Sequence, residues 1–136
     1  QGTDSSGSTA HSRKEQALLR GILFKGFAEV QCAICHRKFP TNLMVAAHIK
    51  PRYLCTTSER KNPDIVMPVC KVGCDDFYEK GYILIDEEGT SRLNERMTCC
   101  EDLRPILLKL DGKKCTHFTD KTAKFFKFKR DNNSNL

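Results

Sequence analysis

Two cysteine pairs constrain the fold of this chain more than any other feature of its sequence. Cys32-Ala-Ile-Cys35 places two thiols on one tight turn, and Cys70-Lys-Val-Gly-Cys74 repeats the arrangement after 34 intervening residues. Both spacings lie within the range found in structural zinc sites, where four thiolates complete a tetrahedron and leave no position open for water or substrate. The sequence therefore predicts one structural zinc ion held by these four cysteines, which stabilises the fold by ~10 kcal/mol or more.

Eight cysteines occur in the chain, and this even number also permits four disulfides in a secreted protein. The N-terminal region is polar, however, and the sequence contains neither a signal peptide nor an apolar run long enough to span a membrane. The close spacing therefore favours metal binding and a reducing, cytoplasmic compartment. The other four cysteines are expected to be buried apolar thiols: Cys55, Cys99, Cys100 and Cys115. Alternatively, the last three and His117 form a second metal site, although their spacing is irregular.

The length of the chain limits the number of domains: 136 residues form one domain and leave little room for a second. Apolar residues make up 39% of the chain and tryptophan is absent, so the core is small and gains from a metal staple. Residues 1–11 are rich in Ser, Gly and Thr and are expected to be a disordered lead-in. One domain is expected over residues 12–130, with a disordered tail over residues 131–136.

Hydrophobic periodicity and capping signals predict an α+β fold. Ser12 and Glu15 have the spacing of a capping box, and the apolar residues that follow recur at helical period, which predicts a helix over residues 13–26. Asp120 is the expected cap of a basic C-terminal helix over residues 119–130. Between them we expect strands over residues 28–31, 43–49 and 65–69, a polar loop over 51–64, a helix over 75–80 closed by Gly81, a hairpin over 82–93 and a helix over 101–110.

Positive charge is concentrated near the C-terminus. The net charge is +6, and residues 113–130 account for all of it, since the rest of the chain has equal numbers of acidic and basic residues. Within this segment Lys124 and Lys127 alternate with phenylalanines, as on an amphipathic helix. The Phe side can pack on the core while the Lys side meets either solvent or the phosphates of a nucleic acid, and the composition is compatible with both.

One histidine stands near the end of an apolar stretch between the two cysteine pairs. His48 belongs to the run from Leu43 to Ile49, where a histidine is commonly a core residue, but Lys50 and Arg52 place two cations directly after it. A neutral imidazole accepts a proton from water near neutral pH, and the two cations can hold a phosphate. His48 is therefore the candidate general base, and Lys50 and Arg52 are candidate nucleic-acid-binding residues.

Over residues 28–90 the chain resembles the HNH nucleases, which have a small zinc-stabilised ββα-metal core. The resemblance lies in the first cysteine pair, the stretch Val45-Ala-Ala-His-Ile-Lys-Pro51, and the segment from Cys74 to Asp86. The AAHIKP string matches one subgroup of the family in particular. The resemblance implies a DNA endonuclease that hydrolyses phosphodiester bonds with Mg²⁺ or Mn²⁺ and leaves 5′-phosphate and 3′-hydroxyl ends.

The resemblance also implies roles for individual residues. His48 matches the base that activates water. The middle residue of the family motif is usually an asparagine; Asn62 is the chemical match and Asp64 stands closer to the usual distance before the third cysteine, so both are candidates. Asp75 takes the place of the usual His or Asn ligand of the catalytic ion, for which a carboxylate is also suitable. Many family members have an acidic residue or a histidine before the base, whereas this chain has Ala47.

We therefore expect a metal-dependent DNA endonuclease, of the kind found in restriction or phage-related defence, that acts as a homodimer or beside a separate recognition domain. The first alternative is a zinc-stabilised nucleic-acid-binding module without catalysis, which Ala47 keeps open. The second alternative is a zinc domain that binds other proteins. Plasmid nicking and DNA binding distinguish the three hypotheses.

Overall fold

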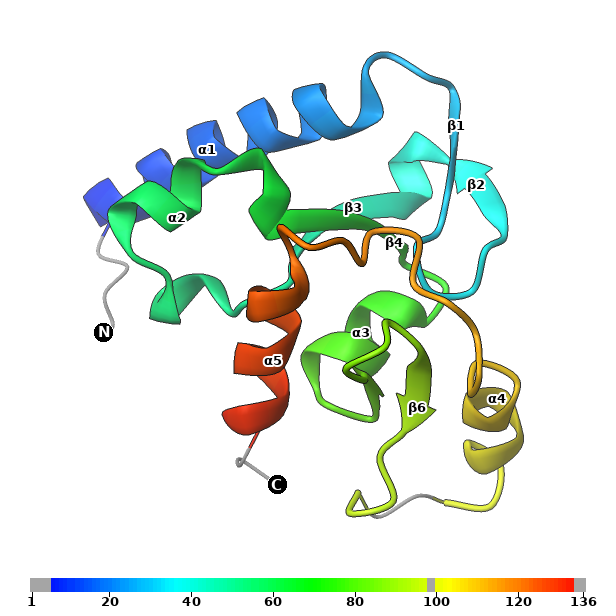
Figure 1. Cartoon of the computed structure of the whole chain (residues 1–136). Coiled ribbons are helices and arrows are strands. Elements are labelled where there is room, and N and C mark those ends of the chain that lie inside the picture. Colours follow the sequence, from blue (N-terminus) through cyan, green and yellow to red (C-terminus); the bar gives the residue numbers. More distant parts are fainter. Residues whose placement is uncertain (1–5, 98–99, 134–136) are drawn as a thin grey trace.

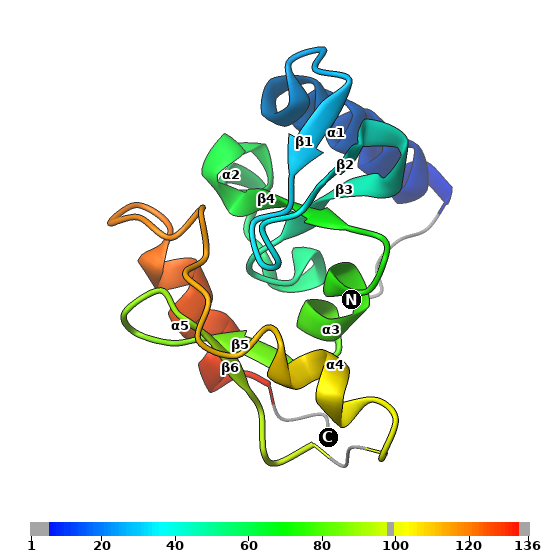
Figure 2. The same cartoon turned by 90° about the vertical axis from the view of Figure 1, so that its right-hand side faces the viewer.

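Three short antiparallel hairpins alternate with helices over residues 6–97 and 100–133, the part of the chain that the computed structural model describes (Figures 1 and 2). The result is a small α+β protein, as expected. The hairpins are β1 (Glu29–Gln31) with β2 (Lys38–Pro40), β3 (Met44–His48) with β4 (Val66–Cys70), and β5 (Ile83–Ile85) with β6 (Ser91–Leu93). The helices are α1 (Ser6–Phe24), α2 (Thr57–Lys61), α3 (Cys74–Glu79), α4 (Arg104–Leu108) and α5 (Ala123–Asp131), with 3₁₀ turns η1 (Thr41–Leu43), η2 (Arg52–Leu54) and η3 (Pro63–Ile65).

The β3–β4 hairpin is the centre of the core. Its register pairs Met44 with Cys70 at one end and His48 with Val66 at the other. Every residue of β4 is buried, as its continuous apolar sequence predicts for a strand covered on both faces. Helix α1 packs along this hairpin (Figure 1), and the Arg20 guanidinium fixes it there by donating to the backbone carbonyls of Met44 and Thr41.

The C-terminal helix α5 packs by its aromatic side, as its alternation of Lys and Phe predicts. Phe125 and Phe126 are buried, and the ring of Phe126 meets Tyr78 of α3 edge-on, with centroids 6.3 Å apart. Two cations of α5 bond to backbone carbonyls of other elements, Lys129 to Glu79 and Arg130 to Ile85. Helix α5 is thereby attached both to α3 and to the last hairpin, beside β5 in Figure 2.

Most of the predicted elements are confirmed, and the differences have local causes. Helix α1 begins at Ser6, so residues 6–11 of the expected lead-in are helical and the Ser12/Glu15 pattern lies inside the helix; residues 1–5 lie outside the described part. The expected loop over 51–64 contains α2, because Thr56 and Glu59 form a capping box there. Helix α5 begins at Ala123 without a side-chain cap, so the expected capping role of Asp120 is wrong. The helix ends at Asp131, the first residue of the expected disordered tail, and residues 134–136 lie outside the described part.

The predicted helix over 101–110 is shorter than expected, since α4 covers Arg104–Leu108. Pro105 lies in the first turn of α4, where backbone N–H groups have no partner within the helix, so the N–H that proline lacks costs no hydrogen bond. In the part of the chain that the structure describes, no helix is long and apolar enough to span a membrane.

Candidate metal centre and candidate active site

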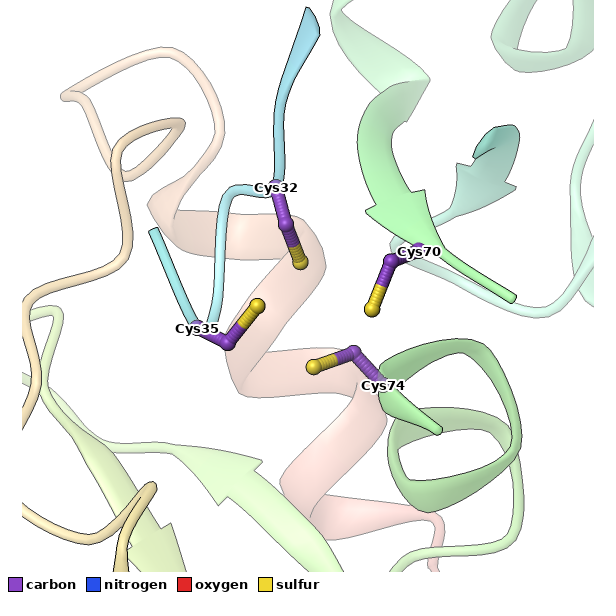
Figure 3. Close-up of side chains that lie close together, drawn as sticks. All are labelled: Cys32, Cys35, Cys70 and Cys74. Atoms are coloured by element: carbon purple, nitrogen blue, oxygen red, sulfur yellow. The ribbon is translucent and has the colours of Figure 1, made fainter. Parts of the chain in front are cut away.

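The four paired cysteines converge on one point in the interior (Figure 3). Their Sγ atoms all lie within 4.8 Å of one another, and all four residues are buried. A tetrahedral zinc ion with Zn–S bonds of about 2.3 Å separates its sulfurs by about 3.8 Å, so the cluster needs little adjustment to hold zinc. The predicted grouping of Cys32, Cys35, Cys70 and Cys74 is confirmed, and its chemistry fits a structural zinc ion.

Tight turns bring each pair of thiols together. After Cys35 the chain turns at His36, which has a φ of +70° and donates its N–H to the Cys32 carbonyl at 3.0 Å. Between Cys70 and Cys74 the turn passes through Gly73, with a φ of +155°. A Cβ atom at Gly73 would lie 2.8 Å from the Phe77 ring, so this position requires glycine.

The charges around the cluster favour a bound cation. Hydrogen bonding to Cys70 and then burial raise the pKa of Cys32 to about 12, and hydrogen bonds with Cys32 and Cys70 raise the pKa of Cys74 well above its ordinary value. Four thiolates therefore do not coexist here without a compensating positive charge, which zinc supplies. Arg37 adds a second positive charge, because its Nε donates to Cys35 Sγ at 3.4 Å.

The remaining cysteines form no further metal cluster among the residues described. Cys55 is a buried thiol whose Sγ donates to the carbonyls of Lys50 and Pro51 at 3.5 and 3.4 Å. Cys115 is buried against the Met67 sulfur, as expected for an apolar thiol, whereas Cys100 is exposed. Cys99 lies outside the described residues. All cysteines that the structure describes are free thiols, which agrees with metal binding and not with a disulfide framework.

A cleft of about 730 Å³ lies beside the metal centre, and His48 and Asp75 both line it. We call it the His48 cleft. Its walls come from five parts of the chain that are distant in sequence: Gln16 and Arg20 of α1, Val45 to His48 of β3, Pro51 to Tyr53 at η2, Asp75, Tyr78 and Glu79 of α3, and Lys129, Asn132 and Asn133 at the end of α5. The fold thus brings together the candidate base and the candidate metal ligand.

His48 is the last residue of β3, and its side chain is half-buried. Its Nε2 atom is buried and, among the described residues, has no hydrogen-bond partner. Burial lowers the pKa of His48 to about 4, an effect that Glu15 opposes and Arg52 and Arg60 reinforce. The imidazole is therefore neutral over the whole physiological range, and its Nε2 atom forms no hydrogen bond with the described residues.

Three carboxylates lie together on the side of the cleft formed by α3. Oxygen atoms of Asp75, Asp76 and Glu79 all approach within 4.8 Å of one another. Burial, then the charges of Glu79 and Asp76, raise the pKa of Asp75. Carboxylate oxygens are the kind of ligand that Mg²⁺ and Mn²⁺ prefer, and two of these three residues, Asp76 and Glu79, are exposed. Glu79 was missed from the sequence, although its position four residues after Asp75 places both on one helix face.

The two cations that follow His48 have different positions. Arg52 lines the His48 cleft, and its Nε donates to Glu15 of α1 at 2.9 Å. Lys50 does not line the cleft: its ammonium is buried, paired with Glu59 at 2.8 Å and seated 4.3 Å from the centre of the Phe128 ring. Lys50 therefore connects η2, α2 and α5, and its ammonium is not directed at a phosphate near His48.

Neither candidate for the middle residue of the family motif reaches the His48 cleft. The Asn62 side chain accepts a hydrogen bond from the Asp64 N–H at 2.9 Å and so stabilises the turn between α2 and η3. Asp64 lines a separate pocket with His117. Asn62 stabilises the loop that leads into β4, whereas Asp64 contributes nothing to the cleft.

The two lysines predicted to bind nucleic acid are on the outside of α5. Lys124 and Lys127 are exposed, with Lys124 near the Phe125 ring and Lys127 paired with Asp131 on its own helix. Both are accessible to a polyanion, whereas Lys129 on the inner side of α5 lines the His48 cleft. The contribution of α1 and of the end of α5 to the cleft was missed, because these segments meet β3 only in three dimensions.

The lowered pKa of His48 makes stability depend on pH. The unfolded chain, with an ordinary histidine pKa of 6.5, binds more protons than the folded chain between pH 6.5 and about 4, so stability falls as pH falls through this window.

We expect the free energy of unfolding of wild type to fall between pH 7 and 5 by about 2 kcal/mol more than that of His48→Gln. Urea unfolding with zinc present measures both. Burial also lowers the pKa of His117, so His117→Gln is the matched control, and parallel pH curves for wild type and His48→Gln would contradict the expectation.

Comparison with known proteins identifies no relative: no model of a known protein family matches the sequence, and no curated protein matches it significantly.

Proposed function

We propose that the protein is a metal-dependent DNA endonuclease of the HNH type, with His48 as its general base. The observation that carries the proposal is the unpartnered, buried Nε2 of His48 in the wall of a cleft that also contains the Asp75 carboxylate; this atom has no hydrogen-bond partner among the described residues. A buried polar atom without a partner costs about 1–3 kcal/mol, and such costs persist in proteins mainly where function requires them.

The arrangement of β3, β4 and α3 supports the proposal. Two antiparallel strands lead directly into a helix, His48 ends the first strand, and Asp75 begins the helix. The Tyr78 hydroxyl donates to the Ile49 carbonyl at 2.8 Å and holds α3 against the end of β3, next to the base. The cysteine cluster connects the end of β4 to the start of α3. We take this order of strand, strand and helix as support for the ββα core that the resemblance of the AAHIKP string to the HNH nucleases implies.

The chain's own residues define the chemistry of hydrolysis. Neutral His48 accepts a proton from water at Nε2 as that water attacks the phosphorus. Arg52, which is paired with Glu15, and Lys129, whose ammonium donates to the Glu79 carbonyl, are cations that line the same cleft and would face the phosphodiester. Asp75 and Glu79 of the cleft, with the neighbouring Asp76, would hold a Mg²⁺ or Mn²⁺ ion, which when bound would neutralise the phosphate and the leaving oxygen. Asp64 takes no part, because it faces the other pocket.

Plasmid nicking with Mg²⁺ or Mn²⁺ tests this function. Conversion of supercoiled plasmid to nicked circles by the zinc-loaded protein is the expected result. If no divalent ion supports nicking while the protein still retards DNA in a gel, the binding module without catalysis replaces the nuclease. Absence of DNA binding would instead favour the zinc domain that binds proteins.

The exposed face of α5 provides a separate test of DNA binding. We expect Lys124→Glu combined with Lys127→Glu to weaken duplex binding and to reduce the slope of log K against log salt by about 1 for each phosphate that the variant no longer neutralises. The matched control is Lys38→Glu with Lys109→Glu, which changes the net charge equally at exposed sites on β2 and after α4. Equal weakening in the two double variants would mean that net charge, and not the α5 face, determines binding.

A further inference from the structure

An exposed aromatic side chain stands at the rim of the His48 cleft. Tyr53 is 70% exposed, more than any other large hydrophobic residue that the structure describes, and it lines the same cleft as His48. Its side chain makes no hydrogen bond or ring contact with the described residues. Packing within the fold therefore does not account for a tyrosine at this position.

The backbone that presents Tyr53 is held on both sides. Before it, Lys50 pairs with Glu59, and directly beside it Arg52 pairs with Glu15. After it, the Cys55 N–H donates a hydrogen bond to the Arg52 carbonyl at 3.0 Å. The Cys55 Sγ donates to the carbonyls of Lys50 and Pro51. A fixed segment that carries an unpacked ring loses little entropy when a planar group stacks on that ring.

The size of the cleft limits what can reach both Tyr53 and His48. A volume of about 730 Å³ is in the range of sites for single small molecules, which is the size of one nucleotide and not of a DNA duplex. A base can stack on a side chain beside the reacting phosphate only if it has left its own base stack. Single-stranded or locally unpaired DNA satisfies this condition, whereas intact duplex does not.

We propose that Tyr53 is a stacking platform for an unpaired base, so that the His48 cleft selects single-stranded or locally unpaired DNA. The inference rests on the proposed nuclease function and specifies its substrate class. Any base can stack on an aromatic ring, because every base has a π-face. Tyr53 therefore distinguishes unpaired from paired DNA and does not distinguish one base sequence from another.

Fluorescence anisotropy tests the proposal in buffer without added divalent ions, where no cleavage intervenes. The probes are a labelled oligothymidylate longer than the ~4–16 nucleotides of a typical single-strand site, and a labelled duplex. Tyr53→Ala is expected to weaken oligothymidylate binding by about 5- to 100-fold and to leave duplex binding unchanged. Tyr53→Phe retains the ring and the affinity. Phe27→Ala is the matched control, since Phe27 is 62% exposed and lines neither cleft nor pocket.

Intrinsic fluorescence gives a second readout of the same ring. The chain has no tryptophan and three tyrosines, of which Tyr78 is buried and Tyr82 is half-buried. The part of the quenching by oligothymidylate that disappears in Tyr53→Phe therefore reports on Tyr53. Failure of wild type to bind oligothymidylate, or equal losses for both probes in Tyr53→Ala, overturns the proposal. If wild type binds and is quenched but cleaves neither supercoiled plasmid nor the single-stranded probe with Mg²⁺ or Mn²⁺, the nuclease function fails while the stacking platform stands.

Discussion

Removal of zinc is expected to unfold the protein. Zinc binding at a four-thiolate site contributes ~10–16 kcal/mol, which equals or exceeds the ~5–15 kcal/mol by which a typical domain is stable. The cluster also joins the turn after β1 to the end of β4 and the start of α3 in the interior of the fold. We expect one zinc per chain, and loss of far-UV circular dichroism when a strong chelator removes the metal.

Cysteine variants separate metal loss from the loss of a buried thiol. Cys74→Ala should abolish stoichiometric zinc and cooperative unfolding, whereas Cys55→Ala, which also removes a buried thiol, should retain one zinc and lose only a few kcal/mol. A metal-free protein that keeps its circular dichroism and melting temperature would contradict the structural role of the cluster. Two zinc ions per chain would indicate a second site that involves Cys99, which lies outside the described residues.

Substitution of His48 by alanine is expected to abolish nicking and to leave the fold intact. General base catalysis contributes about 10²–10⁴-fold in rate, and the Nε2 of His48 makes no hydrogen bond with the described residues that the substitution would break. Zinc content and circular dichroism should therefore match wild type. Because the pKa of His48 is about 4, His48 stays deprotonated between pH 7 and 5, and its protonation should not change the wild-type nicking rate in this range.

The matched control for this variant is His117→Ala, which removes a histidine of similarly lowered pKa from the other pocket. It should nick at the wild-type rate. Equal loss of nicking in both variants, or full activity in His48→Ala, would contradict the assignment of the base.

The metal centre was predictable because its determinants are local. Each pair of thiols is held by one tight turn, and the spacing of Cys32 with Cys35 and of Cys70 with Cys74 is visible in the sequence. The same holds for β5 and β6, whose apolar runs end at turn residues, whereas β2 (Lys38–Pro40) was not predicted. Only the meeting of the two pairs required tertiary structure, and the chemistry of a four-thiolate zinc site made that meeting predictable.

The cleft was predictable only in part, because side-chain direction depends on tertiary contacts. Lys50 stands next to His48 in sequence, yet Glu59 and Phe128 hold its ammonium inside the fold. Likewise, a Ser/Thr-x-x-Glu pattern occurs twice: at Thr56 it caps α2, whereas at Ser12 it lies within α1. A capping signal specifies a helix start only where the preceding chain is not itself helical.

The last segment of the chain lies on the turn that carries the first two thiols. The Thr116 N–H donates to the Ala33 carbonyl at 3.1 Å, the His36 ring contacts the Lys114 carbonyl, and α5 follows with Lys129 in the cleft. During synthesis the four metal ligands leave the ribosome well before this segment does. A nascent chain can thus acquire its metal early while one wall of the cleft is still missing, so the order of translation keeps the His48 cleft incomplete until α5 has been made.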